Sequence, residues 1–243
     1  MKTISKQSKK KSITATWFGH SAFKFESPTG KIVLIDPWLE NPNVPAGAKN
    51  LPRVDLILIT HGHSDHIGNT VEVAIRTGAK VVCIYEIAVH LKNMGVKNVQ
   101  SMNKGGTFDA DGIKVTMTDA KHSSDIDLGD KVIPGGEAAG FVVRFENGFT
   151  IYHAGDTALF GDMKYIGTLY KPDVAFIPIG DHYTMGPREA ALACALLNPK
   201  QIIGMHYGTF PLLTGTPVAL KKFLPAKFKN RVKVLEPGVP TSL

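Results

Sequence analysis

Residues 56–69 read Leu-Ile-Leu-Ile-Thr-His-Gly-His-Ser-Asp-His-Ile-Gly-Asn, an apolar run followed by four side chains that can bind a metal ion. The apolar run predicts a buried strand. Histidine nitrogen and carboxylate oxygen are ligands that zinc, iron and manganese accept, and the end of a strand can hold them in place. Because neighbouring side chains in a loop with a glycine point in different directions, we expect His61 and His63 to serve one ion and Asp65 and His66 a second.

Four ligands cannot complete two metal sites, and three further candidates stand elsewhere in the chain. His122, Asp156 and His206 each come just after an apolar, strand-like run. Several strand ends can meet at one edge of the sheets, so we expect these side chains to converge with the first four. The sequence therefore predicts a site for two divalent metal ions, with zinc as the first choice and manganese, iron or nickel as alternatives.

Hydrophobic patterning predicts an α/β chain with mixed sheets and helices outside. We expect strands at 13–18, 21–27, 32–36, 55–60, 81–85, 113–119, 139–146, 149–152, 173–179 and 201–205. We expect helices at 69–76, 87–94 and 188–197. Asn147-Gly148 is the strongest hairpin signal. The prediction is one domain over 13–243, preceded by a basic, flexible tail over 1–12.

Composition and charge narrow the class of protein. A chain of 243 residues that is 43% hydrophobic can bury a core without disulfides, so Cys83 and Cys194 are interpreted as small buried side chains in a reducing, cytoplasmic protein. No apolar run approaches the roughly 18 residues of a membrane-spanning helix. The net charge of +7 includes five lysines in the first eleven residues, so nucleic acid is not the expected partner. Oligomeric state is left open, with a homo-oligomer as one option.

The pattern of ligands resembles the metallo-β-lactamase superfamily, in which His-x-His-x-Asp-His is followed by a single His, an Asp and a final His. Residues 61–66, His122, Asp156 and His206 match this pattern in order. The resemblance extends from about residue 13 to residue 235. Further segments are similar to the branch of small metal-dependent hydrolases that includes L-ascorbate-6-phosphate lactonase: Trp17-Phe-Gly-His-Ser21, Leu34-Ile-Asp-Pro37, Tyr152-His-Ala-Gly-Asp-Thr157 and Tyr183-Thr-Met-Gly186.

The resemblance implies a four-layer αββα sandwich with the site at one edge between two sheets. It implies that one metal is held by His61, His63 and His122, the other by Asp65, His66 and His206, and that Asp156 bridges them. A hydroxide between the metals would attack a small ester, lactone or phosphoester, and Asp65 would orient it and accept its proton. Two dications, two carboxylates and a hydroxide sum to about one positive charge, so an anionic small-molecule substrate is expected.

Other polar residues are candidates for supporting roles, each with a plainer alternative. His20 would be a catalytic wall of the pocket that donates a proton or binds a substrate oxygen, or else a hydrogen-bonded turn histidine. Asp36 would orient a ligand imidazole, or else only form a turn. His153 would line the site, or else pack behind it. One loop is expected to contact substrate, with His182 as a catalytic candidate: His182, Tyr183, Thr184 and Met185.

Two other functions compete with small-molecule hydrolysis. A nuclease of the same fold, acting on RNA or DNA, is favoured by the basic ends of the chain and disfavoured by the absence of an obvious extra nucleic-acid-binding domain. A metal-binding module without turnover would need a missing ligand or a blocked position, and the full ligand set argues against it.

Overall fold

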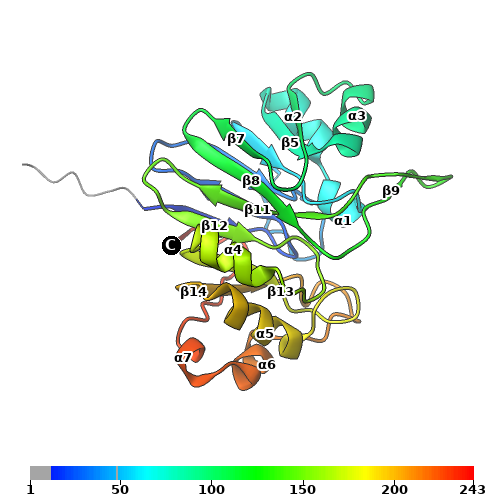
Figure 1. Ribbon diagram of the computed structural model, residues 1–243. Helices are drawn as coiled ribbons and strands as arrows, with labels where there is room; N and C mark the ends of the chain where they lie inside the picture. The colour runs from blue at the N-terminus through cyan, green and yellow to red at the C-terminus, as the bar shows by residue number, and fades with distance from the viewer. Residues whose placement is uncertain (1–11, 48) are drawn as a thin grey trace, which may run out of the picture.

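The computed structural model describes residues 12–47 and 49–243, so the basic tail predicted at 1–12 lies, apart from Ser12, outside the described residues. Two mixed β-sheets lie face to face with helices on their outer sides (Figure 1). The first sheet holds, in spatial order, β15 (Thr241–Ser242), β1 (Thr14–Trp17), β2 (Phe23–Glu26), β3 (Ile32–Ile35), β4 (Leu56–Leu58), β5 (Lys80–Ile84) and β6 (Val99–Met102). The α/β sandwich expected from the sequence is confirmed.

The second sheet carries most of the later half of the chain. It holds, in spatial order, β14 (Gln201–Met205), β13 (Val174–Pro178), β12 (Thr150–His153), β11 (Ala139–Arg144), β8 (Ile113–Asp119) and β7 (Thr107–Ala110). A small ribbon of β9 (Ile126–Asp127) and β10 (Val132–Ile133) projects beyond the sheets (Figure 1). The helices are α1 (Ser64–Ile67), α2 (Thr70–Thr77), α3 (Tyr85–Asn93), α4 (Met163–Tyr170), α5 (Pro187–Leu197), α6 (Pro217–Phe223) and α7 (Ala226–Lys229).

Apolar side chains from the two sheets interlock to form the core. The ring of Phe176, on β13, lies 4.7 Å from that of Phe23 and 5.3 Å from that of Phe25, both on β2, measured between centroids. Edge-to-face pairs of this kind contribute about 0.5–1.5 kcal/mol beyond the burial of their area. Cys83 and Cys194 are free and buried, and burial raises the pKa of each thiol to about 12, which confirms the prediction of small buried side chains.

Parallel pairing brings several strand ends to one edge of the sandwich. Strands β3 and β4 run parallel, as do β12, β13 and β14. The loops that leave the carboxyl ends of β3, β4, β12 and β14 carry residues 36–38, 59–66, 154–157 and 206–212. All predicted metal ligands except His122 lie in these loops or in α1, and His122 follows β8.

Most expected elements are present, and the differences have local causes. Strand β4 ends at Leu58 rather than at residue 60, because the backbone N–H of Thr60 donates to the Asp36 carboxylate 2.9 Å away. Helix α3 begins at Tyr85, which was expected to end a strand. Helix α4 was not expected. Its Gly167 weakens helix propensity, yet a Cβ there would lie 2.4 Å from the carbonyl oxygen of Leu197 on α5, so close helix packing requires this glycine.

Helix length bears on the expectation of a protein without membrane spans. Within residues 12–47 and 49–243, no helix is both long and apolar enough to cross a bilayer. The longest of these helices, α5, has 11 residues.

Candidate metal centre

The structure brings the seven predicted ligands together. The ligand atoms of His61, His63 and His122 lie within 4.8 Å of one another. Those of Asp65, His66 and His206 do so as well, and this second group also includes His20, which was not predicted as a ligand. A third group consists of His61, His66 and Asp156. Because His61 belongs also to the first group and His66 to the second, the first and second groups lie next to each other.

Asp156 occupies the junction between the two sets. Its Oδ2 lies 2.8 Å from Nε2 of His206, 3.3 Å from Nε2 of His66 and 3.8 Å from Nε2 of His122. Burial would raise the pKa of Asp156, but the imidazoles of His206 and His66 outweigh burial and hold the pKa well below its usual range. Asp156 is therefore a carboxylate, as a bridging metal ligand must be.

Buried polar atoms at the junction test whether these residues fit a metal ion. Oδ1 of Asp156 and Nε2 of His66 are buried and have no hydrogen-bond partner among the described residues. A buried polar atom without a partner costs about 1–3 kcal/mol, and such atoms are rare in native proteins. Two of them within one cluster of imidazoles and carboxylates are what a divalent-ion site requires of its donors. The residues fit the metal ions that the sequence predicts.

Asp36 orients the histidines from behind. The buried Asp36 carboxylate accepts a hydrogen bond from Nδ1 of His66 at 2.8 Å and another from Oγ1 of Thr60 at 2.7 Å. The Thr60 hydroxyl in turn lies 2.9 Å from Nδ1 of His61, which can donate to it. This chain places the Nδ1 proton on both imidazoles and leaves Nε2 of each to face the centre. The position agrees with the predicted orienting role of Asp36.

The pKa values of His61 and His66 shift in opposite directions. Burial lowers the pKa of His61 well below its ordinary value. Burial also acts to lower the pKa of His66, but the carboxylates of Asp156 and Asp36 outweigh it and raise the pKa well above its ordinary value. His66 thus lies between two negative charges, a setting that stabilises a bound cation as well as a bound proton.

Strained backbone aims several of these side chains. His20, Asp36 and His206 have φ values of 53°, 47° and 55°, in the left-handed region that residues other than glycine seldom adopt. Such residues cost on the order of 1–3 kcal/mol each and gather at functional sites. The glycine between His61 and His63 is also constrained, since a Cβ at Gly62 would lie 2.3 Å from the carbonyl oxygen of Ser124.

His20 is fully buried and is not among the residues that line the cavity. Its Nε2 lies 3.0 Å from Oδ2 of Asp65, and its Nδ1 lies 3.0 Å from Oγ1 of Thr209. Burial lowers the pKa of His20 to about 4, so near neutral pH Nε2–H donates to Asp65 and Nδ1 accepts from the Thr209 hydroxyl. The placement matches the alternative of a hydrogen-bonded turn histidine.

His153 lies behind the site. Its side chain is fully buried; Nε2 donates to the carbonyl oxygen of Ser21 at 3.2 Å, and Nδ1 accepts from the N–H of Gly155 at 3.2 Å. Both ring nitrogens therefore have partners away from the ligands. Of the two readings open for this residue, the structure corresponds to packing behind the site.

A cavity of about 860 Å³ opens beside the ligands. Its lining includes five ligands and nine other residues: His63, Asp65, His122, Asp156 and His206, with Trp38, Ser64, Ser123, Asp125, Asp127, Tyr183, Phe210, Pro211 and Leu212. Trp38 and Phe210 were not predicted to line the site, although Trp38 closely follows Asp36 and Phe210 closely follows His206. Asp125 and Asp127 were not predicted either, because no local pattern distinguishes them from surface acids.

The loop predicted to contact substrate contributes only Tyr183 to the cavity lining. Met185 is 2% exposed and belongs to the hydrophobic core. Thr184 is half-buried and His182 exposed, and neither is among the residues that line the cavity. The loop turns at Asp181 and His182, which have φ values of 71° and 60°. The contact of this loop with substrate stays a prediction.

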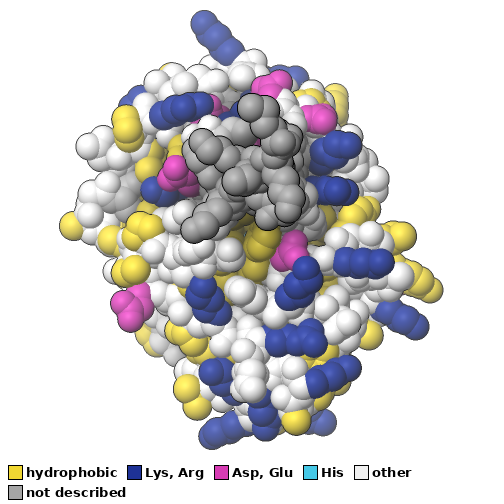
Figure 2. All heavy atoms as spheres, turned by 90° about the vertical axis from the view of Figure 1, so that its left-hand side faces the viewer, with side chains coloured by type: hydrophobic (Ala, Val, Ile, Leu, Met, Phe, Trp, Pro, Cys, Tyr) yellow, Lys and Arg dark blue, Asp and Glu magenta, His cyan; other side chains and the backbone are white. Residues whose placement is uncertain are grey.

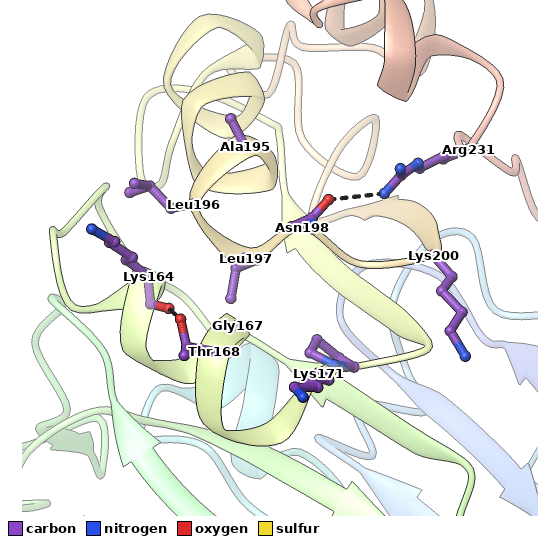
Figure 3. Close-up of a pocket in the computed structure, with 11 residues that line it drawn as sticks. Lys164, Gly167, Thr168, Lys171, Ala195, Leu196, Leu197, Asn198, Lys200 and Arg231 are labelled. Atoms are coloured by element: carbon purple, nitrogen blue, oxygen red, sulfur yellow. Dashed lines mark hydrogen bonds between the residues drawn. The ribbon is translucent and has the colours of Figure 1, made fainter.

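A second cavity, of about 770 Å³, lies where α4 and α5 end (Figure 3). Its lining includes Lys164, Lys171, Lys200 and Arg231, and Arg231 donates to Oδ1 of Asn198. Among its described lining residues there is no His, Cys, Asp or Glu, so this cavity offers no metal ligands.

Charged side chains of both signs lie on one face of the molecule. The face turned toward the viewer in Figure 2 is the left side of Figure 1, away from α1 and β9. Lys and Arg side chains are scattered over this face, with Asp and Glu side chains among them (Figure 2). The candidate metal ligands lie on the other side of the molecule, around α1.

Comparison with known proteins agrees with this geometry. Residues 31–207 match the family model described as the β-lactamase superfamily domain. The chain belongs to the β-lactamase superfamily. All seven predicted ligands of this superfamily member fall within the matched residues, which end one position after His206.

Relatives place the chain more narrowly within the superfamily, in the UPF0173 metal-dependent hydrolase family. A UPF0173 metal-dependent hydrolase of Koribacter versatilis is 55% identical over 210 residues, 86% of this chain and 90% of the relative. Another, of Methanopyrus kandleri, is 48% identical over 226 residues, 92% and 96% of the two chains. The solved structure of Igni18, a metallo hydrolase from Ignicoccus hospitalis, matches with a TM-score of 0.85 at 39% identity, covering 96% of this chain and 99% of that one. The narrower resemblance to L-ascorbate-6-phosphate lactonase stays a prediction.

Proposed function

We propose that this superfamily member is a hydrolase that holds two divalent metal ions between its seven ligands, with zinc as the first choice and manganese, iron or nickel as alternatives. The observation that carries the proposal is the position of Asp156, whose Oδ2 lies 2.8–3.8 Å from imidazole nitrogens of both ligand sets. His61, His63 and His122 would hold one ion and Asp65, His66 and His206 the other, with Asp156 shared. Membership in a family of metal-dependent hydrolases supports this reading.

When bound, the two ions supply Lewis acidity, lowering the pKa of a water toward about 7 and polarising the substrate oxygen. Asp65 would receive the proton of that water. Burial would raise the pKa of Asp65, but His66 and the hydrogen bond from His20 hold it below its usual range. Asp65 is therefore ionised, with one oxygen fixed by His20 and its side chain on the cavity wall. His20 acts as a positioning residue for Asp65.

The scissile bond of a small ester, lactone or phosphoester would lie against this centre, inside the cavity beside it. A nuclease function finds no support in that cavity, because none of its described lining residues is Lys or Arg. Binding of a nucleic-acid backbone depends on such cations.

The proposal is tested by turnover. Protein purified without chelator or nickel resin is stripped, reloaded with zinc or manganese, and assayed on an aryl ester, a lactone, a thioester and a phosphodiester. We expect metal-dependent hydrolysis of at least one of these substrates, and its loss in Asp156→Ala. The matched control is Asp173→Ala. Asp173 directly precedes β13, at the end of that strand away from the metal centre, so this variant keeps activity. Equal turnover with and without metal would contradict the proposal.

A further inference from the structure

The cavity beside the metal centre has one acidic side. Ser123, Asp125 and Asp127 lie on the segment that connects His122 to the β9–β10 ribbon. Both aspartates line the cavity, and neither belongs to the groups of metal ligands. Within residues 12–47 and 49–243, neither forms an ion pair with a Lys or Arg. Two carboxylates are thus presented to whatever enters the cavity.

The acidic side is held rigidly against the ligands. Ser124 Oγ accepts from the N–H of Gly62 at 3.1 Å and donates to the carbonyl oxygen of Gly135 at 3.1 Å. Both glycines are needed, because a Cβ at either position would lie 2.3 Å or less from the Ser124 carbonyl oxygen. The position of Asp125, next to Ser124, is therefore coupled to the loop that carries His61 and His63.

The other side of the cavity is aromatic and apolar. The rings of Trp38 and Phe210 lie 5.8 Å apart between centroids, tilted by 30°. The buried ring of His20 packs edge-on against both, at 5.2 Å and 5.6 Å. Tyr183 and Leu212, each 52% exposed, extend this side outward. Aromatic rings and carboxylates that line one cavity suit an apolar body with a cationic group, because the faces of aromatic rings also attract cations.

The metal-ligating end of the cavity marks where the reacting group is held. Oδ1 of Asp156 is buried and has no hydrogen-bond partner in the part of the chain that the structure describes, and Asp156 lines the cavity. The predicted centre has about one net positive charge when loaded, and the carboxylates of Asp125 and Asp127 reverse that sign for the cavity as a whole. Among its described lining residues, no Lys or Arg restores a positive charge. The expectation of an anionic substrate did not include these two carboxylates.

We infer that the cavity selects a carboxyl ester or lactone whose body is apolar or aromatic and which carries a positively charged amine, with Asp125 and Asp127 as the residues that determine this specificity. The inference rests on the proposed function, since it assumes that the reacting group is held at the metal centre.

Three benzohydroxamates test the inference, because the hydroxamate chelates the metal and leaves the ring substituent in the cavity. The substituents are aminomethyl, ethyl and carboxymethyl at the same ring position, and affinity for the zinc-loaded protein is measured by calorimetry. We expect the aminomethyl probe to bind about tenfold more tightly than the ethyl probe, and the carboxymethyl probe about tenfold more weakly, from two partly screened charge interactions. In the Asp125→Asn/Asp127→Asn variant all three affinities should become equal within about twofold, with zinc content unchanged.

The Asp130→Asn variant is the control, since it removes the same charge from the same ribbon at a residue that does not line the cavity. It should keep the preference for the aminomethyl probe. Binding of all three probes to wild type with equal affinity, or best binding of the carboxymethyl probe, would overturn the inference and leave the metal centre standing. A preference that survives in the double variant would also overturn it. If no probe binds the zinc-loaded protein, the proposed metal centre fails and the inference fails with it.

Discussion

Replacing Asp36 with Asn tests whether the carboxylate behind the ligands sets their metal affinity. Asn tolerates the positive φ of 47° at this position, so the backbone is not strained by the change. The single side-chain oxygen can still accept from the N–H of Thr60, as Oδ1 does now at 2.9 Å. The new NH2 group then replaces Oδ2, which accepts from Nδ1 of His66 and from the Thr60 hydroxyl. Two donors would face each other, and His66 can relieve the conflict only by moving its proton to Nε2, the atom that faces the centre.

The expected loss follows from that tautomer change. Removing a partner that orients a metal-bound histidine lowers metal affinity by about 10–100-fold, or about 1.4–2.8 kcal/mol. A hydrogen bond to a charged group contributes about 1.5–3 kcal/mol, which agrees with this loss of metal-binding free energy. Competition titration with a chromogenic zinc chelator measures the loss, and circular dichroism checks that the variant is folded. The control is Asp55→Asn. The Asp55 carboxylate lies away from the site and accepts a hydrogen bond of 2.8 Å from the N–H of Ile32. Wild-type zinc affinity in folded Asp36→Asn would refute the orienting role.

Three further predictions concern stability. Gly62→Ala should destabilise the fold by about 1–3 kcal/mol, because its Cβ would meet the Ser124 carbonyl at 2.3 Å, whereas Gly161→Ala, with open space around its Cβ, should have little effect in a urea titration. Burial lowers the pKa of His153 to about 4. Below pH 6.5 the His153 imidazole of the unfolded chain therefore gains a proton that the folded chain does not bind. About 3 kcal/mol of the free energy of unfolding should be lost as the pH falls toward 4, and the loss should be smaller in His153→Gln. A wild-type pH dependence in that variant would contradict the assignment. Stripping the metals should lower the melting temperature, and re-adding zinc at about 100 times its Kd should restore about 2.7 kcal/mol; a melting temperature indifferent to zinc would count against the site.

The convergence of the seven candidate ligands could be predicted because they follow apolar, strand-like runs. An apolar run that ends in a metal-binding side chain is a local signal, and it appears at residues 56–66 and again before Asp156 and His206. The boundaries of β14, Gln201–Met205, match the prediction because Asn198-Pro199 and Gly208 set the strand apart from its surroundings.

The cavity walls could not be predicted, because they depend on contacts between distant parts of the chain. Asp125 follows His122 closely in sequence, yet its place in the cavity depends on Ser124, which bonds to Gly62 and Gly135. The role of His20 likewise depends on Asp65, which lies 45 positions away. Neither partner is visible in a local pattern, so the sequence could not decide whether His20 contacts substrate or is a hydrogen-bonded turn histidine.

The most direct test of the central claim is the metal content of the chain, measured by elemental analysis on protein purified without chelator or nickel resin and repeated for Asp156→Ala. If two ions are held between adjoining ligand sets that share the Asp156 carboxylate, we expect about two metals per wild-type chain. We expect the Asp156→Ala variant to lose both. One metal per wild-type chain, or an Asp156→Ala variant that retains two, would contradict a dinuclear centre bridged by Asp156.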